Sequence, residues 1–175
     1  MVLVVTGPIA SGKSTLARAI ACELRARGTK AAAVELDLIY EMLDHARAPK
    51  TDVATWAQAR RMAARLTTAL LAEGVAVVVE GEFLTAAERA EFTDALTPEV
   101  EPRFITLSLS YELAMQRASS DPTRGLSRDP VFLRRHYEET AQTVREAPPT
   151  DLALDTGAMG VADSARVTAD WASSD

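Results

Sequence analysis

Residues 7–14 read Gly7-Pro8-Ile9-Ala10-Ser11-Gly12-Lys13-Ser14, which fits the phosphate-binding loop pattern G-x-x-x-x-G-K-[ST]. The two glycines permit backbone angles that residues with a Cβ resist, so successive N–H groups can converge on phosphate oxygens. In this pattern the lysine places its charge between the β- and γ-phosphates, and the serine hydroxyl ligates Mg²⁺. The stretch therefore predicts a site for a nucleoside triphosphate, ATP or GTP, bound together with Mg²⁺.

The sequence on either side of the loop agrees with this prediction. Residues 1–5 (MVLVV) have the pattern of a short buried strand, and residues 15–27 that of a helix with one apolar face. The helix would point its positive N-terminal end at the bound phosphates. We expect the nucleotide to be held by the following residues: Gly7, Ile9, Ala10, Ser11, Gly12, Lys13, Ser14, Thr15 and, later in the chain, Arg117.

Apolar strand-like segments alternate with longer helical ones along the rest of the chain. Further strands are expected at 31–36, 75–79, 103–109 and 151–154, and further helices at 51–72 (or from 52), 85–96, 111–118, 131–145 and 161–171. Residues 75–79 (VAVVV) predict a central strand covered on both faces. The alternation predicts an α/β fold: one domain over residues 1–175, with a five-stranded parallel sheet and helices on both faces.

Acidic residues follow two of the expected strands, where ligands bind in parallel sheets. Asp37 comes after the strand at 31–36 and is the best placed catalytic base for a hydroxyl acceptor. Glu35 is a lesser candidate for the same role. The alternative is that Asp37 caps a helix.

Glu80 and Glu82 follow the strand at 75–79. Glu80 comes directly after the apolar run, as a carboxylate that supports Mg²⁺ requires, and Glu82 is an alternative on the substrate side. Gly81 between them would let a ligand approach the backbone closely. The alternative reading is that both acids belong to a solvated loop. Phe83 is a candidate for the wall of an acceptor pocket, or for the core.

Arginines gather in a polar segment, and residues 119–130 are expected to form a short lid. Arg124 and Arg128 could grip phosphate oxygens and stabilise the charge that spreads over a transferring phosphoryl group. Gly125 and two prolines suit the segment to closing over a nucleotide. A solvated arginine surface is the alternative. Arg134 and Arg135 are weaker candidates for the same role.

Composition narrows the functional classes. The chain has 175 residues and a formal net charge of −6, which argues against nucleic acid as a partner. No run of about 18 apolar residues is present, so no membrane span is expected. A single cysteine, Cys22, excludes an internal disulfide and fits a cytoplasmic protein; it is expected to be buried or half-buried. His45 and His136 lack metal-ligand spacing, which favours surface or core roles.

With these features the chain resembles the small phosphate-loop kinases that include chloramphenicol phosphotransferase and related antibiotic kinases. The resemblance rests on these segments: Gly7–Thr15, the D-x-x-Y pattern from Asp37 to Tyr40, VVVEGEFL at 77–84, the arginine-bearing lid and LALDT at 152–156. In that family the aspartate matching Asp37 is the proposed base. Where chloramphenicol phosphotransferase has two adjacent aspartates after its central strand, this chain has Glu80-Gly81-Glu82.

The resemblance implies transfer of a γ-phosphoryl group to a hydroxyl of a small molecule, plausibly an antibiotic. Asp37, Tyr40, Glu82 and Phe83 are the expected contacts to this acceptor. Relatives that act on nucleoside antibiotics such as capuramycin share the size and motif order. Metabolic kinases of the gluconate, shikimate or nucleoside type and toxin-like kinases of nucleotide sugars stay open, as does, less favoured, a non-catalytic nucleotide switch. The sequence does not decide between a monomer and a homo-oligomer.

Overall fold

Strands and helices alternate along the chain in the computed structural model, which describes residues 1–44, 52–122 and 124–174. Each strand is followed by a helix, and β2 passes into α2 without an intervening loop. In chain order the elements are β1 (Val2–Thr6), α1 (Lys13–Ala26), β2 (Ala31–Glu35), α2 (Leu36–Leu43), α3 (Val53–Ala72), β3 (Ala76–Glu80), α4 (Ala86–Thr93), β4 (Arg103–Ser108), α5 (Tyr111–Ser120), the 3₁₀ turn η1 (Leu126–Arg128), α6 (Pro130–Glu146), β5 (Leu152–Asp155) and α7 (Val161–Ala172).

The sheet has five parallel strands in the order β2-β3-β1-β4-β5, which confirms the predicted fold class. The strand order reverses around β1, and such a switch point is where open α/β sheets bind ligands. The predicted central strand, β3, is buried along its whole length, as expected. The middle position nevertheless belongs to β1, and β3 lies beside it.

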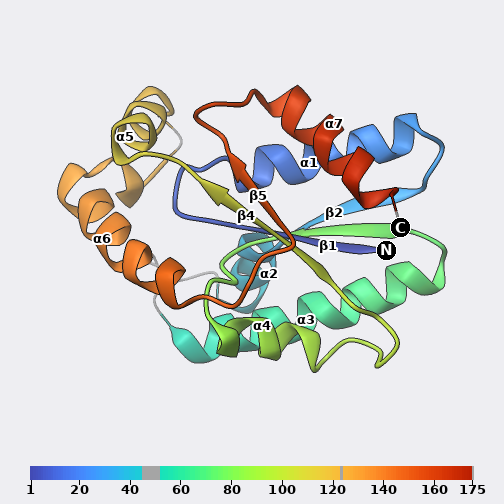
Figure 1. Cartoon of the computed structure of the whole chain (residues 1–175). Helices are drawn as coiled ribbons and strands as arrows, with labels where there is room; N and C mark the ends of the chain where they lie inside the picture. The colour runs from blue at the N-terminus through green and yellow to red at the C-terminus, as the bar shows by residue number, and fades with distance from the viewer. Residues whose placement is uncertain (45–51, 123, 175) are drawn as a thin grey trace.

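The two faces of the sheet carry separate cores because side chains alternate along each strand. Leu3 and Val5 of β1 face a cluster with the apolar sides of α1 and α7. Val2 and Val4 face the opposite cluster, which includes α2, α3 and α4. Figure 1 shows α1 and α7 on one side of the sheet, α3 and α4 on the other, and α5 with α6 beyond the sheet's end. This third group covers the loop that follows β1.

Helix starts follow the capping signals in the sequence. The side chain of Asp52 accepts hydrogen bonds from the backbone N–H groups of Ala54 and Thr55 at the start of α3. The predicted capping box of Thr85 and Glu88 is present at the start of α4. Both caps satisfy N–H groups that have no partner within the helix. The other alternative for the start of α3, residue 51, lies outside the described residues.

One alternative interpretation and one expectation about single residues are wrong. Asp37 is not a helix cap, because α2 begins at Leu36 with Glu35 in the N-cap position, and Asp37 lies in the first helical turn. Cys22 is exposed rather than buried. The guanidinium of Arg25 donates to its sulfur at 3.0 Å. Cys22 is next to the buried face of α1 in sequence, but the helical rotation of about 100° per residue carries it to the solvent side.

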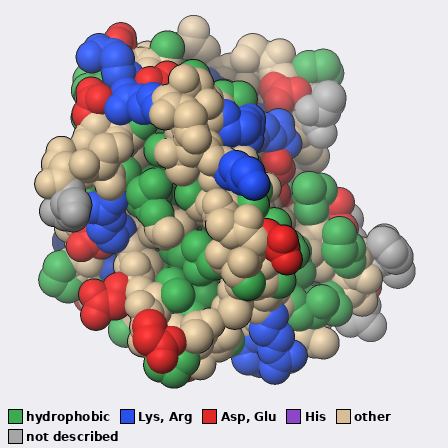
Figure 2. All heavy atoms as spheres, turned by 90° about the vertical axis from the view of Figure 1, so that its right-hand side faces the viewer, with side chains coloured by type: hydrophobic (Ala, Val, Ile, Leu, Met, Phe, Trp, Pro, Cys, Tyr) green, Lys and Arg blue, Asp and Glu red, His purple; other side chains and the backbone are tan. Residues whose placement is uncertain are grey.

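The molecular surface carries mixed charge on the face that includes both chain ends. Figure 2 shows Lys and Arg side chains on this face separated by acidic, polar and hydrophobic ones. None of the helices in the described ranges combines the length and the apolar character that a membrane crossing would require.

Candidate active site

The phosphate loop connects β1 to α1 with the backbone conformation that anion binding requires. Ala10 has φ +63° and Gly12 has φ +93°, so two left-handed residues flank Ser11. Such alternation turns successive N–H groups toward one side of the chain and forms a concave anion site. A left-handed conformation costs a residue with a Cβ on the order of 1 kcal/mol, so Ala10 must be held in place by its surroundings.

Lys13, the first residue of α1, folds its side chain back over this loop. Its Nζ donates to the carbonyl oxygens of Gly7 at 2.9 Å and Pro8 at 3.1 Å. The ammonium group thereby lies beside the N–H groups that would bind phosphate. The helix start adds its own positive potential at the same place. Together these groups form a site for a strongly anionic ligand.

Ser14 and Glu80 contact each other at the point where β3 ends. The hydroxyl of Ser14 donates to Oε1 of Glu80 at 3.2 Å, and Glu80 is only 3% exposed. Burial, with smaller contributions from the charges of Asp37 and Glu35, raises the pKa of Glu80 to about 7, against the opposing effects of Lys13 and of the hydrogen bond from Ser14. A buried carboxylate with so few compensating charges is a good partner for a cation.

This pair fits Mg²⁺ bound together with a nucleotide. Mg²⁺ is usually held by one or two protein groups, phosphate oxygens and water rather than by a complete protein cage. Accordingly, the described residues contain no group of three or more His, Cys, Asp or Glu side chains that could hold a metal ion. Ser14 and Glu80 are the residues that would hold Mg²⁺, which when bound would neutralise phosphate charge.

The other acidic residues of this edge differ in their surroundings. Glu35 pairs with Arg18, with Nη2 and Oε1 2.6 Å apart, so it is less suited to act as a base. Asp37 and Glu82 are exposed. Desolvation raises the pKa of the Glu82 carboxyl, and Asp37 adds to the rise while Lys13 opposes it. Asp37 is therefore close enough to Glu80 and Glu82 to influence both.

Three residues proposed to contact the acceptor or ligand lie in the packed interior instead. Tyr40 and Phe83 are fully buried in the cluster beneath α2 and α4. The Tyr40 ring packs against the ring of Trp56, with centroids 4.3 Å apart and ring planes tilted by 41°. A Cβ on Gly81 would come within 2.7 Å of Leu36, so this glycine serves the packing of α2 rather than ligand approach. In this structure none of the three offers a surface to a substrate.

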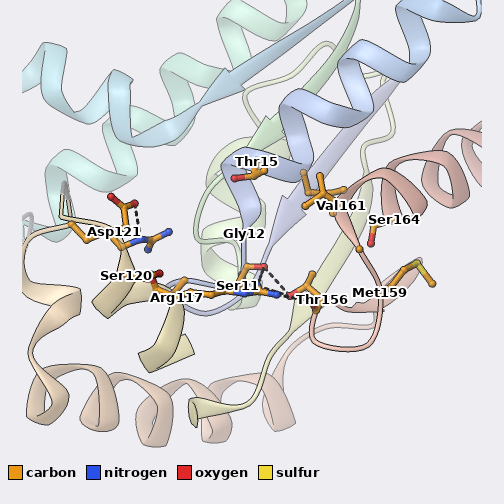
Figure 3. A pocket seen from close by; sticks show the side chains of 14 residues that line it. Ser11, Gly12, Thr15, Arg117, Ser120, Asp121, Thr156, Met159, Val161 and Ser164 are labelled. Carbon is orange, nitrogen blue, oxygen red and sulfur yellow. Dashed lines mark hydrogen bonds and ion pairs between the residues drawn. The ribbon is translucent and has the colours of Figure 1, made fainter. Parts of the chain in front are cut away.

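A cavity of about 370 Å³ opens beside the phosphate loop. One wall consists of loop residues and α1, and the other of α5 and the segment between β5 and α7 (Figure 3). Arg117 donates to the carbonyl oxygen of Thr156 at 2.6 Å and to the Thr156 hydroxyl at 3.2 Å. It also donates to the carbonyl oxygen of Ser11 at 3.4 Å, which connects this wall to the phosphate loop. The Thr156 hydroxyl in turn donates to the carbonyl oxygen of Ser11 at 2.9 Å.

Sequence reasoning missed the part of the second wall that comes after β5. Its residues are Thr156, Met159, Gly160, Val161 and Ser164. One signal in the sequence could have indicated these residues. The last strand ends near Asp155, and the segment that follows the carboxyl end of a parallel strand borders the ligand site. Thr15 and Arg117, both predicted to bind nucleotide, line the same cavity. The cavity thus adjoins the phosphate loop and brings together residues from distant parts of the chain that the sequence predicted to bind nucleotide.

The lid arginines occupy different environments. Arg124 lines the cavity and pairs with Asp121 at 3.3 Å. Arg128, in η1, is exposed and does not line it. Arg134 lies over the ring of Tyr111, and Arg135 pairs with Glu139 on the solvent side of α6. Of these four, Arg124 is the best placed to reach a bound nucleotide.

His136 was expected on the surface or in the core, but it contacts the phosphate loop. Its Nε2 accepts a hydrogen bond of 3.0 Å from the backbone N–H of Ile9. The neighbouring Tyr137 donates its hydroxyl to the carbonyl oxygen of Ile9, also at 3.0 Å. The other histidine, His45, lies outside the described residues.

Comparison with solved structures identifies the same fold in several kinases. A gluconokinase from Sinorhizobium meliloti is 22% identical, with a TM-score of 0.62 over 94% of this chain and 87% of that one. The APS kinase of Mycobacterium tuberculosis is 20% identical, with a TM-score of 0.71 over 99% and 98%. A shikimate kinase from Bacteroides thetaiotaomicron is 16% identical, with a TM-score of 0.66 over 97% of both chains.

These likenesses establish a common fold, that of the phosphate-loop kinases. A search of curated proteins finds no significant match. The sequence model of one family, described as an AAA domain and designated AAA_33, matches residues 2–148. Because the match includes the phosphate loop and covers well over half of the sequence, the chain belongs to this AAA domain family.

Proposed function

We propose that this chain is a phosphotransferase that moves the γ-phosphoryl group of ATP or GTP, bound with Mg²⁺, to a hydroxyl group of a small molecule. The observation that carries the proposal is the meeting of Lys13, Ser14 and Glu80 at the end of the sheet, with Asp37 close enough to affect the carboxyl of Glu80. Phosphoryl transfer needs phosphate positioning, a metal and a carboxylate for the attacking alcohol, and these residues can supply all three.

Each residue has a distinct part in this reaction. Lys13 and the loop N–H groups hold the phosphates, and Ser14 with Glu80 holds the metal ion. Asp37 orients the acceptor hydroxyl and takes its proton late, since the transition state of phosphoryl transfer is loose. Arg124 approaches from the lid and stabilises charge on the transferring group. We place Arg128 in the same role when the lid closes.

The charge of the acceptor side favours a neutral or cationic acceptor over an acid. Asp37 and Glu82 are exposed there. Arg60 is 5% exposed and is bound to Glu88 and Glu91, with its Nε on the carbonyl oxygen of Glu82. The charge of Arg60 is thus already paired with the carboxylates of Glu88 and Glu91 and does not attract an acidic acceptor. The charge supports an antibiotic or nucleoside hydroxyl over a hydroxylated carboxylic acid such as gluconate or shikimate.

The proposal is tested by measuring ADP and GDP formation with a panel of acceptors. The panel contains chloramphenicol, nucleoside antibiotics, nucleosides, nucleotide sugars, gluconate and shikimate, each incubated with the protein, Mg²⁺ and ATP or GTP. Phosphorus NMR identifies any phosphorylated product. Lys13→Ala should lower the turnover of an active acceptor by several orders of magnitude, because the lysine charge acts where the transition state develops. Lys30→Ala, an exposed lysine in the turn before β2, is the matched control.

The outcomes separate the possible functions. Turnover of an uncharged acceptor that is lost in Lys13→Ala and kept in Lys30→Ala supports the proposal. Faster turnover of gluconate or shikimate would retain the kinase and overturn the argument from charge. Tight nucleotide binding without transfer to any acceptor would favour a nucleotide switch. Undiminished turnover in Lys13→Ala would end the kinase interpretation.

A further inference from the structure

Both polar backbone groups of Ile9 are held by one helix from a distant part of the chain. Ile9 donates its N–H to Nε2 of His136 and accepts from the hydroxyl of Tyr137, each at 3.0 Å. The two side chains are consecutive on α6, 127 and 128 residues away in sequence. Ile9 is the third residue of the phosphate loop. The contact therefore joins α6 to the segment that would bind phosphate.

These bonds fix the orientation of two successive peptide groups. In a trans peptide the C=O and N–H point in opposite directions. Lys13 and the backbone N–H of Ser11 hold the Pro8 carbonyl, while His136 holds the N–H on the other side of that peptide. In the next peptide Tyr137 holds the Ile9 carbonyl, so the N–H of Ala10 must point away from α6.

The second peptide matters because it precedes the strained residue of the loop. The φ angle of Ala10 is the rotation about the bond that joins this peptide to its Cα, and it has the unfavourable value of +63°. Holding the peptide plane from outside limits the rotation by which Ala10 could relax. The hydroxyl of Tyr137 thus stabilises the conformation that turns the following N–H groups toward a phosphate.

The surroundings keep His136 in the neutral form that this contact needs. An Nε2 that accepts a hydrogen bond carries no proton. Burial, with a further contribution from the charge of Lys13, lowers the pKa of His136 to about 4, against a small opposing effect of Glu139. The Thr140 hydroxyl lies 3.3 Å from the same nitrogen. His136 therefore remains an acceptor at neutral pH.

Packing holds α6 against α5 and against the phosphate loop. The ring of Tyr137 meets that of Tyr111 edge to face, with centroids 6.0 Å apart, and Ala10 packs in the same apolar cluster as Leu133. Helix α6 begins at Pro130, the last residue of the segment expected to form the lid (119–130). Movement of that segment would pull on the helix that holds Ile9.

We propose that His136 and Tyr137 are positioning residues that hold the phosphate loop, through the backbone of Ile9, in its phosphate-binding conformation. The proposal rests on the nucleotide-binding part of the proposed function and concerns no acceptor. The two residues act on the loop rather than on the reacting atoms. Their loss should weaken phosphate binding more than it weakens the fold.

The experiment measures MgADP binding by calorimetry and the melting temperature for single variants of the whole chain. Tyr137→Phe removes only the hydroxyl, and His136→Leu removes the acceptor. Each should weaken MgADP binding by roughly 3- to 10-fold, the effect of one net hydrogen bond. His136→Gln should bind nearly as wild type, because a glutamine amide oxygen can replace Nε2. Tyr111→Phe is the matched control, since its hydroxyl bonds only the Pro130 carbonyl in the described residues.

Hydrogen exchange of the segment 7–14 in the ligand-free protein gives a second readout. Exchange should be faster in Tyr137→Phe and His136→Leu and unchanged in Tyr111→Phe. Wild-type affinity and exchange in Tyr137→Phe would overturn the proposal, as would an equal loss of affinity in Tyr111→Phe. If His136→Leu does not fold, Tyr137→Phe and His136→Gln decide. If wild type itself fails to bind MgADP, the proposed function fails, and unchanged exchange in Tyr137→Phe would separately exclude the loop contact.

Discussion

Replacing Glu80 with glutamine is expected to stabilise the ligand-free protein, and increasingly so as the pH rises. Glu80 is 3% exposed, and Asp37 and Glu35 add negative potential around it. The ionised carboxylate is therefore costly in the folded state. Glutamine retains a similar shape and an oxygen that can accept the hydrogen bond from Ser14, but it carries no charge.

The size and the sign of the effect follow from the pKa. In the folded protein the pKa of Glu80 is about 7, against an ordinary value of 4.5. Between these values the folded state keeps a proton that the unfolded state has lost, so the free energy of unfolding falls as the pH rises. One pKa unit corresponds to about 1.4 kcal/mol, so the loss approaches about 3 kcal/mol by pH 8. At pH 4 the carboxyl is protonated in both states and costs nothing.

Urea unfolding at several pH values between 4 and 8 measures this effect. Subtracting the curve of Glu80→Gln from that of the wild type removes the contributions of all other titrating groups. The difference should grow through the interval from pH 4.5 to 7 and then level off. Glu73→Gln, at an exposed position after α3, should run parallel to the wild type. Parallel curves for Glu80→Gln as well would refute the assignment of a buried, uncompensated carboxylate.

Three further predictions concern the reaction itself. Asp37→Asn should lower kcat by roughly 10²–10⁴ with nucleotide affinity nearly unchanged; single-turnover transfer at wild-type rate would remove Asp37 as the base. Arg124→Ala should lower kcat more than it raises the acceptor KM. Arg128→Ala should have the same effect to a smaller extent, because of these two arginines only Arg124 lines the cavity in this structure. If steady-state kinetics instead showed a larger rise in the acceptor KM than fall in kcat, both arginines would be reassigned to the acceptor side. Ser14→Ala should raise the Mg²⁺ concentration for half-maximal rate at least ~10-fold, and an unchanged Mg²⁺ titration would contradict its role as a ligand.

The fold was predictable because its signals are local. The glycine loop, the apolar run of β3 and the capping box of α4 each lie within a few consecutive residues. Once strands alternate with helices, a parallel sheet follows from the short connections. Helix α2 was missed, and Leu36 was assigned to the preceding strand, although the signal for this helix was local too. Leu36, Ile39 and Tyr40 already have the spacing of a buried helical face, and the strand passes into that helix without a loop.

The site was only partly predictable because its remaining parts depend on distant contacts. Nothing near His136 in sequence indicates that it reaches Ile9, and nothing near Thr156 indicates that it receives Arg117. The same holds for packing, since Gly81 has the spacing of a ligand-facing glycine and is required by the side chain of Leu36. Such relations arise when helices pack on the sheet, and one sequence does not encode them in any short pattern.

The electrostatics of the loop and of Glu80 argue that nucleotide and cation bind together. Lys13 is the main charge that offsets Glu80 in the ligand-free protein. A phosphate bound by the loop would share the positive charge of Lys13, and it would add negative charge next to a carboxylate already surrounded by Asp37 and Glu35. Phosphate without a cation should thus drive Glu80 further toward its protonated form. A cation held by Ser14 and Glu80 would reverse this effect, so a carboxylate that is expected to weaken the fold would become favourable only in the loaded site. The cost to folding is then the consequence of a residue kept for binding, as is common where activity and stability conflict.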